Sequence, residues 1–343
     1  MLFLVTLEAL RAHTEEGKMR LQSAVATVLL SVMLPAAPVH AQQKAGDFPA
    51  RAVRLVVPYP PGASNDIVAR LLGQKLSEAW GQQLVIDNRS GAGGLVGAEI
   101  VARASPDGYT LLMTNPGSNA INFALRAKTP YRPEDFASVT LLGWSPIMLL
   151  TSATFPAASM NELIAIARAK PGQLSGGSSG AGGSSHLALE YFKMLSGTDI
   201  LHVPYKGAAP AITDMIGGQV SIIFTTPVTA QAMIRAGKIK ALAVAGNRRL
   251  EVFPDVPTTS EQGMKGYDVN IWFGISAPAG TPRPLILRIA RDLHAAIASA
   301  DVKERFAGLG LEPQVSTPEA FDRIIREDIE RWSKVVKAAK LAP

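Results

Sequence analysis

Two glycine- and serine-rich segments carry the residues of this sequence that are best suited to binding chemistry. Residues 59–66 read Tyr-Pro-Pro-Gly-Ala-Ser-Asn-Asp, and residues 175–186 read Ser-Gly-Gly-Ser-Ser-Gly-Ala-Gly-Gly-Ser-Ser-His. Each segment follows an apolar run and precedes a helical pattern. The first N–H groups of a helix lack intrahelical acceptors and lie at the positive end of the helix dipole. Because glycine lets the backbone approach a ligand closely, the segments predict carboxylate or phosphate binding without charged side chains.

Two other interpretations of these segments stay open. Gly and Ser are common in tight turns, so the segments also fit plain turns. Residues 176–180, Gly-Gly-Ser-Ser-Gly, match the nucleophile elbow of the α/β hydrolases, which makes Ser178 a candidate nucleophile. Such a hydrolase needs an acidic residue and then a histidine downstream of that serine. Only His294 comes late enough in the chain, so the serine hydrolase is the weaker interpretation.

The rest of the sequence gives little support for a cofactor, a metal site or acid–base catalysis. The loop at residues 88–94 misses the dinucleotide-binding spacing, because Val96 stands where a third glycine is needed. No loop ends in the Gly-Lys-Ser/Thr of a nucleoside triphosphate site. The chain has no cysteine, and His186, His202 and His294 are not at metal-ligand spacing. We therefore expect no cofactor, no metal and no catalytic residues.

Length and charge narrow the function classes further. A chain of 343 residues usually exceeds what one hydrophobic core serves, so two lobes are expected. The formal net charge is +6, with lysine and arginine spread along the chain. A nucleic-acid-binding protein concentrates its positive charge on one face or stripe. We therefore expect no nucleic-acid partner.

Short apolar runs that alternate with helical patterns predict an α/β fold with parallel strands and crossover helices. Strands are expected at residues 54–57, 84–86, 109–113, 139–142, 147–150, 200–203, 220–224, 239–244 and 267–276. Helices are expected from Ser64, at 95–104, 160–170, 187–195, 208–216, 228–236, 285–298 and 302–309, and from Pro318. The extended segments near 143–149 and 270–277 are the expected crossings between lobes. They assign residues 48–146 and 275–343 to the first lobe and residues 147–274 to the second.

The N-terminal region has the pattern of a secretory signal peptide. After Met19, a basic residue precedes an apolar stretch at residues 24–34, and Val39-His40-Ala41 fits a signal peptidase site. Residues 1–18 contain acidic residues and fit no signal peptide, so we expect translation to start at Met19. Residues 1–41 are then an N-terminal extension plus a signal peptide, and cleavage after Ala41 would leave the mature chain in the periplasm.

Ordered sequence blocks run from about residue 48 to near the C-terminus. They include Val57-Pro58-Tyr59-Pro60-Pro61-Gly62, Asp66-Ile67-Val68-Ala69-Arg70, Asp87-Asn88-Arg89, Pro106-Asp107-Gly108-Tyr109, His202-Val203-Pro204-Tyr205-Lys206-Gly207 and Pro254-Asp255-Val256-Pro257-Thr258. In these blocks the chain resembles the Bug family, the substrate-binding proteins of tripartite tricarboxylate transporters. The resemblance implies a type II periplasmic-binding-protein fold. In that fold two lobes each have a central, mostly parallel sheet flanked by helices, and the ligand binds in the cleft between them.

The resemblance also implies a solute-binding protein rather than an enzyme. Such a protein captures a small carboxylate and delivers it to a large and a small membrane subunit of the transporter. The ligand-binding component of a membrane sensor is the alternative, because it would share this fold. We expect a monomer that closes over its ligand.

Ligand contacts are expected from both lobes. The first lobe supplies Gly62, Ala63, Ser64 and Asn65, and the second supplies Ser178, Ser179, Gly182, Gly183 and Ser184. Asn115 and Thr225, each at the end of a strand, are expected to add side-chain contacts. Two of these positions depart from the family pattern: Ala63 replaces a glycine, and Gly183 replaces a serine or threonine. The Ala63 methyl group is expected to restrict φ or to narrow the pocket.

Overall fold

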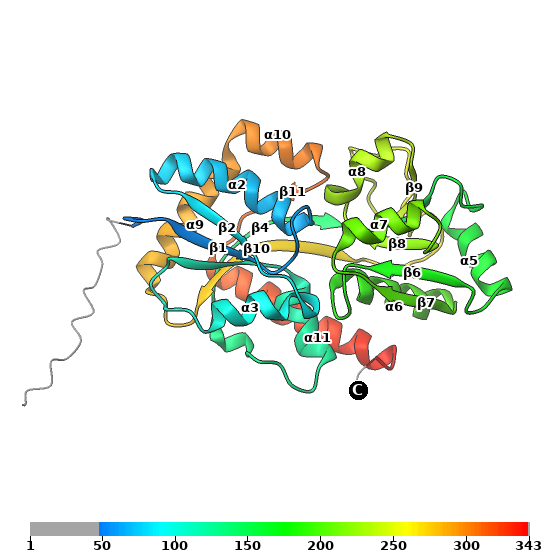
Figure 1. Ribbon diagram of the computed structural model, residues 1–343, viewed down its shortest axis with the longest axis horizontal. Helices are drawn as coiled ribbons and strands as arrows, with labels where there is room; N and C mark the ends of the chain where they lie inside the picture. The colour runs from blue at the N-terminus through cyan, green and yellow to red at the C-terminus, as the bar shows by residue number, and fades with distance from the viewer. Residues whose placement is uncertain (1–47, 342–343) are drawn as a thin grey trace, which may run out of the picture. The chain divides into compact units, whose positions relative to one another are not determined.

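The computed structural model describes residues 48–341, which form two β-sheets with helices on both faces of each (Figure 1). We call each sheet together with its helices a lobe. The expected signal peptide, the start at Met19 and the cleavage after Ala41 lie outside the described residues. None of the described helices is long and apolar enough to cross a membrane.

The first lobe has a six-stranded sheet in the order β11-β4-β10-β3-β1-β2. Its strands are β1 (Val53–Val57), β2 (Leu84–Asn88), β3 (Thr110–Thr114), β4 (Phe136–Pro146), β10 (Asn270–Pro278) and β11 (Glu312–Pro313). Its main helices are α2 (Ser64–Trp80), α3 (Leu95–Ala102), α9 (Arg283–Ala298), α10 (Ala300–Gly308) and α11 (Pro318–Ala338). Short helical turns follow β2 and β3 at Ala92–Gly94 and Gly117–Ile121, then come α4 (Asn122–Leu125) and a turn at Pro133–Asp135.

The second lobe has a five-stranded sheet in the order β7-β6-β8-β5-β9. Its strands are β5 (Met148–Ser152), β6 (Leu174–Ser178), β7 (Ile200–Pro204), β8 (Ile222–Thr225) and β9 (Ile239–Val244). Its helices are α5 (Met160–Ala169), α6 (Ser184–Ser196), α7 (Ala208–Ile216) and α8 (Pro227–Arg235). Each of these helices follows a strand, so its N-terminus comes close to the carboxyl end of that strand.

Both sheets are mixed rather than mostly parallel, which corrects the expected strand directions. Strands β1, β2 and β3 are parallel, as are β6, β7 and β8. By contrast, β10 runs antiparallel to β3 and β4, and β5 runs antiparallel to β8 and β9. The chain leaves the first sheet along β4, enters the second along β5 and returns along β10, so β5 and β10 run opposite to the parallel strands of their sheets. The expected crossings are therefore strands for most of their length, and the residue bounds of the lobes stay a prediction.

Strand β6 was not expected, because glycine and serine are poor strand formers. Residues Ser175 to Ser178, which the sequence placed in a loop, pair with β7 and β8 instead. A Cβ atom on Gly176 would lie 2.7 Å from the Leu189 side chain of α6. Glycine at this position therefore lets α6 pack directly onto the sheet.

Alternate residues of the first sheet face two separate layers of helices. Leu55 and Leu111 lie with α2 and α9, whereas Val56 and Leu112 lie with α3. This alternation is what the two-residue period of a strand requires when both faces of a sheet are buried. It also explains why the strands read as continuous apolar runs in the sequence.

Helix α11 covers the sheet beside β10. The Trp272 ring packs edge-on against Phe321 with centroids 5.3 Å apart, and its Nε1 donates a hydrogen bond to Asp328 at 2.9 Å. Gly274 lies against the Phe321 ring, and a Cβ atom there would overlap that ring. The absence of a side chain at Gly274 therefore sets how closely α11 approaches the sheet.

Replacing Gly274 by Ala is expected to destabilise the fold by about 1–3 kcal/mol, because the Phe321 ring would have to move. Gly308→Ala is the matched control, since Gly308 is helical and a Cβ atom added there would have no neighbour within 4 Å. That control is expected to be neutral or to stabilise the fold by about 0.5 kcal/mol. Urea unfolding measures both, and equal effects would contradict this account of α11 packing.

Candidate functional site

The N-termini of four helices surround one cavity of about 60 Å³ between the two lobes, which we call the four-helix cavity. Helix α2 of the first lobe and helices α6, α7 and α8 of the second all begin at its wall. The residues from these four N-termini are Ala63, Ser64 and Asn65, Ser184 and Ser185, Gly207 and Ala208, and Thr225 and Thr226. The other lining residues are Tyr59, Asn115, Ile147, Ser179 and Ile271.

No charged side chain lines this cavity among the residues that the structure describes. Its electrostatics therefore come from the backbone, because each helix N-terminus carries about half a positive charge. The first N–H groups of each helix also lack an intrahelical acceptor. Four such ends at one point make a site for an anion that needs no lysine or arginine.

The hydrogen bonds of Asn115 determine which end of the neighbouring Asn65 amide is free. The backbone N–H of Ser118 can only donate, and it donates to Asn115 Oδ1 at 3.1 Å. Asn115 Nδ2 is therefore the donor to Asn65 Oδ1, at 3.0 Å. This leaves Asn65 Nδ2 buried and without a hydrogen-bond partner among the described residues. A ligand acceptor would satisfy it.

Hydroxyl groups supply the other polar side chains of the cavity. The hydroxyl of Ser184 is buried and has no partner among the described residues. The hydroxyl of Ser179 lies 2.8 Å from that of Ser185. Ser64 Oγ lies 2.8 Å from Thr226 Oγ1, and this contact joins the two lobes across the cavity.

Seven of the predicted contact residues line the cavity. They are Ala63, Ser64, Asn65, Asn115, Ser179, Ser184 and Thr225. The Ala63 backbone has φ of −70°, an ordinary value for alanine, so its methyl group adds no backbone strain. Because Asn115 Oδ1 and Nδ2 both have protein partners, Asn115 acts on the cavity chiefly by orienting Asn65.

Four predicted contact residues do not line the cavity: Gly62, Ser178, Gly182 and Gly183. The N–H of Gly62 donates to Asp66, and that of Gly182 donates to His186 Nδ1. Both glycines have φ of 80°, so they shape their loops. Gly183 precedes α6 and donates its N–H to Gly180 O.

Seven lining residues were missed by the sequence argument. They are Tyr59, Ile147, Ser185, Gly207, Ala208, Thr226 and Ile271. The N-termini of α7 and α8 carried a usable signal, because each also follows a strand and Pro227 opens α8. The two isoleucines had none, since nothing in an apolar strand tells which residue faces a cavity.

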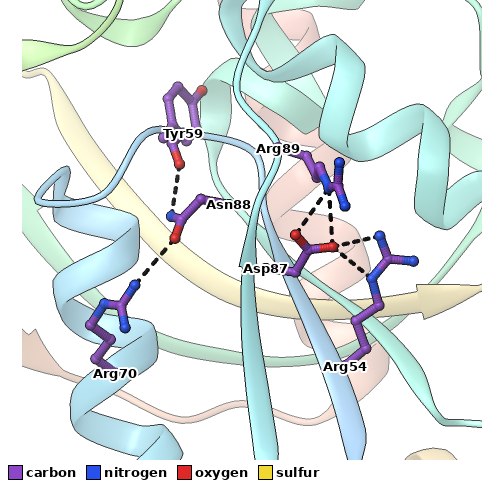
Figure 2. Close-up of polar contacts among 6 residues, drawn as sticks. All are labelled: Arg54, Tyr59, Arg70, Asp87, Asn88 and Arg89. Carbon is purple, nitrogen blue, oxygen red and sulfur yellow. Dashed lines mark hydrogen bonds and ion pairs between the residues drawn. The ribbon is translucent and has the colours of Figure 1, made fainter.

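A group of charged and amide side chains holds the first loop, residues 58–63 between β1 and α2 (Figure 2). Asn88 at the end of β2 donates Nδ2 to Tyr59 O at 2.9 Å and to Asp66 Oδ1 at 3.0 Å. Its Oδ1 accepts from Arg70 at 3.2 Å. Beside it, Asp87 accepts from Arg54 and Arg89 (Figure 2). Asn88 thus ties the loop at Tyr59 to the first turn of α2.

Asp66 completes this support at the N-terminus of α2. Burial raises the pKa of its carboxyl group, but hydrogen bonds from Arg70, the Gly62 N–H and Asn88 outweigh burial and hold the pKa below its ordinary value. The carboxylate is therefore ionised at neutral pH. It fixes Gly62 and helps orient the helix end that faces the cavity.

Two stacked histidines hold the second loop, residues 179–183 between β6 and α6. The His186 and His202 rings lie 3.9 Å apart, and His202 Nε2 lies 2.7 Å from Ser178 Oγ. Because His186 Nδ1 accepts from the Gly182 N–H at 3.3 Å, that nitrogen carries no proton. Burial lowers the pKa of both rings, that of His202 to about 4. Neutral histidines therefore hold the loop from Ser178 to Gly182.

The two lobes touch closely around the cavity. A Cβ atom on Gly93 of the first lobe would lie 2.9 Å from Ala181 O of the second. One on Gly207 of the second lobe would lie 2.6 Å from Pro60 Cγ. Together with the Ser64–Thr226 contact, these close approaches show that the two lobes are closed over the cavity.

Comparison with known proteins places this geometry in a family. Residues 68–341 match the family described as the tripartite tricarboxylate transporter family receptor, TctC. The chain belongs to that family. Protein BugT of Bordetella pertussis is 34% identical over 90% of this chain and 95% of its own length.

Solved structures agree with this assignment. A protein of R. palustris solved with adipate is 36% identical, with a TM-score of 0.84 over 87% of this chain and all of that one. MatC from Rhodopseudomonas palustris, solved with bound malate, is 35% identical, with a TM-score of 0.81 over 84% of this chain and 100% of that one. The fold is thus the type II periplasmic-binding-protein fold, and the chain is a solute-binding protein of the TctC/Bug family.

The serine hydrolase interpretation is wrong, because this is a family of binding proteins and not of enzymes. The structure explains the misleading Gly-Gly-Ser-Ser-Gly motif. Ser178 ends strand β6, is 1% exposed, and accepts a hydrogen bond from the Gly180 N–H. Its partner His202 contacts another histidine rather than an acid.

Acidification is expected to destabilise the folded protein through the histidine pair. Their folded-state pKa values are lower than the unfolded value of about 6.5, so protons bind the unfolded chain more readily. The contribution of the histidine pair to the free energy of unfolding is complete above pH of about 6.5 and is lost as pH falls toward about 4. Urea unfolding should show that the free energy of unfolding falls less steeply on acidification in His202→Gln than in the parent protein. Identical pH profiles would contradict this role.

Gly93→Ala is expected to weaken ligand binding by preventing full closure, because its Cβ would strike the backbone of the other lobe. Gly81→Ala is the matched control: Gly81 has φ of 62° against 68° for Gly93, yet a Cβ atom added at Gly81 would have no neighbour within 4 Å. Both variants carry similar backbone strain, of about 1 kcal/mol. Calorimetry with a bound acid should show the larger affinity loss in Gly93→Ala, and equal losses would contradict the closure argument.

Proposed function

We propose that this protein captures a small carboxylate in the four-helix cavity and delivers it, in the periplasm, to the large and small membrane subunits of a tripartite transporter. The observation that carries the proposal is the meeting of four helix N-termini in a cavity that no charged side chain of the described residues lines. The relatives solved with adipate and with malate support a carboxylate as the ligand.

The donors of the cavity match the acceptor capacity of a carboxylate. An ionised carboxylate offers about four lone-pair positions and no donor. The cavity offers the free N–H groups of the helix ends, together with Asn65 Nδ2 and the Ser184 hydroxyl, which have no partner among the described residues. Hydrogen bonds to an ionised acceptor are about twice as strong as neutral ones. A carboxylate would therefore use donors that the closed protein leaves unsatisfied.

Closure would follow from ligand contacts with both lobes. Helix α2 belongs to the first lobe, and α6, α7 and α8 belong to the second, so an anion in the cavity would contact both. A ligand shifts an open–closed equilibrium only through a difference in affinity between the two states. An anion that contacts helix ends of both lobes has that difference. Ile147, between β4 and β5, and Ile271, in β10, line the same cavity.

The predicted contacts divide into two proposed roles. Ala63, Ser64, Asn65, Ser179, Ser184 and Thr225 would contact the ligand directly. Asn115 would orient Asn65, whereas Gly62, Ser178, Gly182 and Gly183 would shape the loops. Gly207, Ala208, Ser185 and Thr226 are added to the direct contacts, because they line the cavity at the other helix ends.

A thermal-shift screen tests the ligand class. Small carboxylic acids are expected to raise the melting temperature, because a ligand that binds only the native state stabilises it. The matching neutral amides are expected to have no effect at equal concentration. Amides that stabilise as well as the acids would contradict an anion site.

Asn65→Asp is expected to weaken carboxylate binding at least about 100-fold, because it places a like charge beside the ligand. Asn161→Asp is the matched control, since Asn161 is also the second residue of its helix but is exposed. There the new carboxylate meets a helix dipole and no ligand, so affinity should not change. Calorimetry measures both. An unchanged affinity in Asn65→Asp would remove Asn65 from the site.

A further inference from the structure

A second chamber, of about 600 Å³, adjoins the four-helix cavity. The two hollows share Tyr59 and Ser179 as lining residues. The four-helix cavity has about a tenth of the volume of the second chamber. A ligand that is held by one carboxylate at the helix ends and is long enough to pass Tyr59 and Ser179 would reach the second chamber.

The second chamber differs from the first in its charge. Two cations line it, Arg126 from the first lobe and Lys206 from the second, and no acidic residue is among its described lining residues. Neither cation forms an ion pair within residues 48–341. The one hydrogen bond of the Arg126 side chain to a described residue runs from Nε to Asn122 Oδ1, at 3.1 Å. The other guanidinium N–H groups and the Lys206 ammonium group are thus available to a ligand.

The positions of these cations connect them to closure. Arg126 directly follows α4, and its Nη2 would lie 3.5 Å from a Cβ atom on Gly182 in the other lobe. Lys206 lies between β7 and α7, one residue before Gly207, which approaches Pro60 across the lobes. Both cations therefore stand where the lobes meet. An anionic group between them would contact both lobes at a second point.

We propose that Arg126 and Lys206 form a second anion subsite and determine specificity for ligands that carry a further negative group at the far end. This inference rests on the proposed function, since it assumes that the first carboxylate binds at the helix ends. The four-helix cavity then recognises one acid group of any ligand. The second chamber selects for the charge at the other end.

Calorimetry with pairs of acids of equal chain length tests the subsite. Adipate is compared with hexanoate, glutarate with pentanoate and succinate with butyrate, so each pair differs only in the second carboxylate. The diacid is expected to bind at least about 10-fold more tightly than the monoacid in the pair that binds best. Its affinity should also fall more steeply with added salt.

Variants assign that preference to the two cations. Lys206→Met is expected to weaken diacid binding about 10-fold while leaving the monoacid unchanged. The same result is expected for Arg126→Met, and Arg126→Lys should restore part of the loss. Lys128→Met is the matched control, because Lys128 lies two residues from Arg126 but lines neither hollow. The Lys206 side chain has no hydrogen bond or ion pair among the described residues, so its variant should fold normally.

The outcomes separate this inference from the proposed function. Equal affinity for diacids and monoacids, or an equal loss for both in Lys206→Met, would overturn the second subsite and leave the carboxylate site standing. Failure of every acid to bind would overturn the proposed function, and the inference with it. A diacid preference that disappears in both charge-removing variants, but not in Lys128→Met, would establish the subsite.

Discussion

The free N–H groups at helix N-termini are the constraint on which the rest of this structure depends. Every helix leaves its first N–H groups without an intrahelical acceptor, and burying such groups unpaired costs free energy. Here four helices bring those groups to one buried point. Recognition by a buried lysine or arginine would instead require a second charge to be desolvated. Uncharged donors avoid that cost.

The remainder of the protein holds those helix ends in place. Parallel strands place the start of each following helix at one edge of a sheet, so α2 from one lobe and α6 to α8 from the other converge. Asp66 and Asn88 fix the first loop, and His186 and His202 fix the second. Aromatic packing of Trp272 and Phe321 holds β10, a strand that connects the lobes. Residues far from the cavity thus determine its geometry.

Much of this arrangement follows from the sequence, because strand-to-helix order and loop composition are local signals. The loops at Ala63–Asn65 and Ser179–Ser184 were predicted on that basis, and residues of both line the cavity. Strand direction could not be predicted, since β5 and β10 are antiparallel only as a result of how the chain passes between sheets. Strand β6 was missed because its glycines serve helix packing, which is a tertiary requirement.

Finer features of the site depend on contacts between distant residues. The free donor of Asn65 is fixed by Ser118 through Asn115, which is 50 residues away, and no local pattern encodes it. Gly62 and Gly182 do not line the cavity, and their positive φ angles bend the loops that carry the lining residues. Arg126 and Lys206 line the second chamber from opposite lobes. Sequence composition, with charge spread evenly, gave no sign of that pairing.

A crystal structure of the protein with a bound acid is the sharpest test of anion binding at the four helix ends. We expect one carboxylate within hydrogen-bond distance of backbone N–H groups from α2 and from at least one of α6, α7 and α8. We also expect Asn65 Nδ2 to donate to that carboxylate. An acid bound only to arginine or lysine side chains, with water alone at the four helix ends, would contradict anion binding by the helix ends.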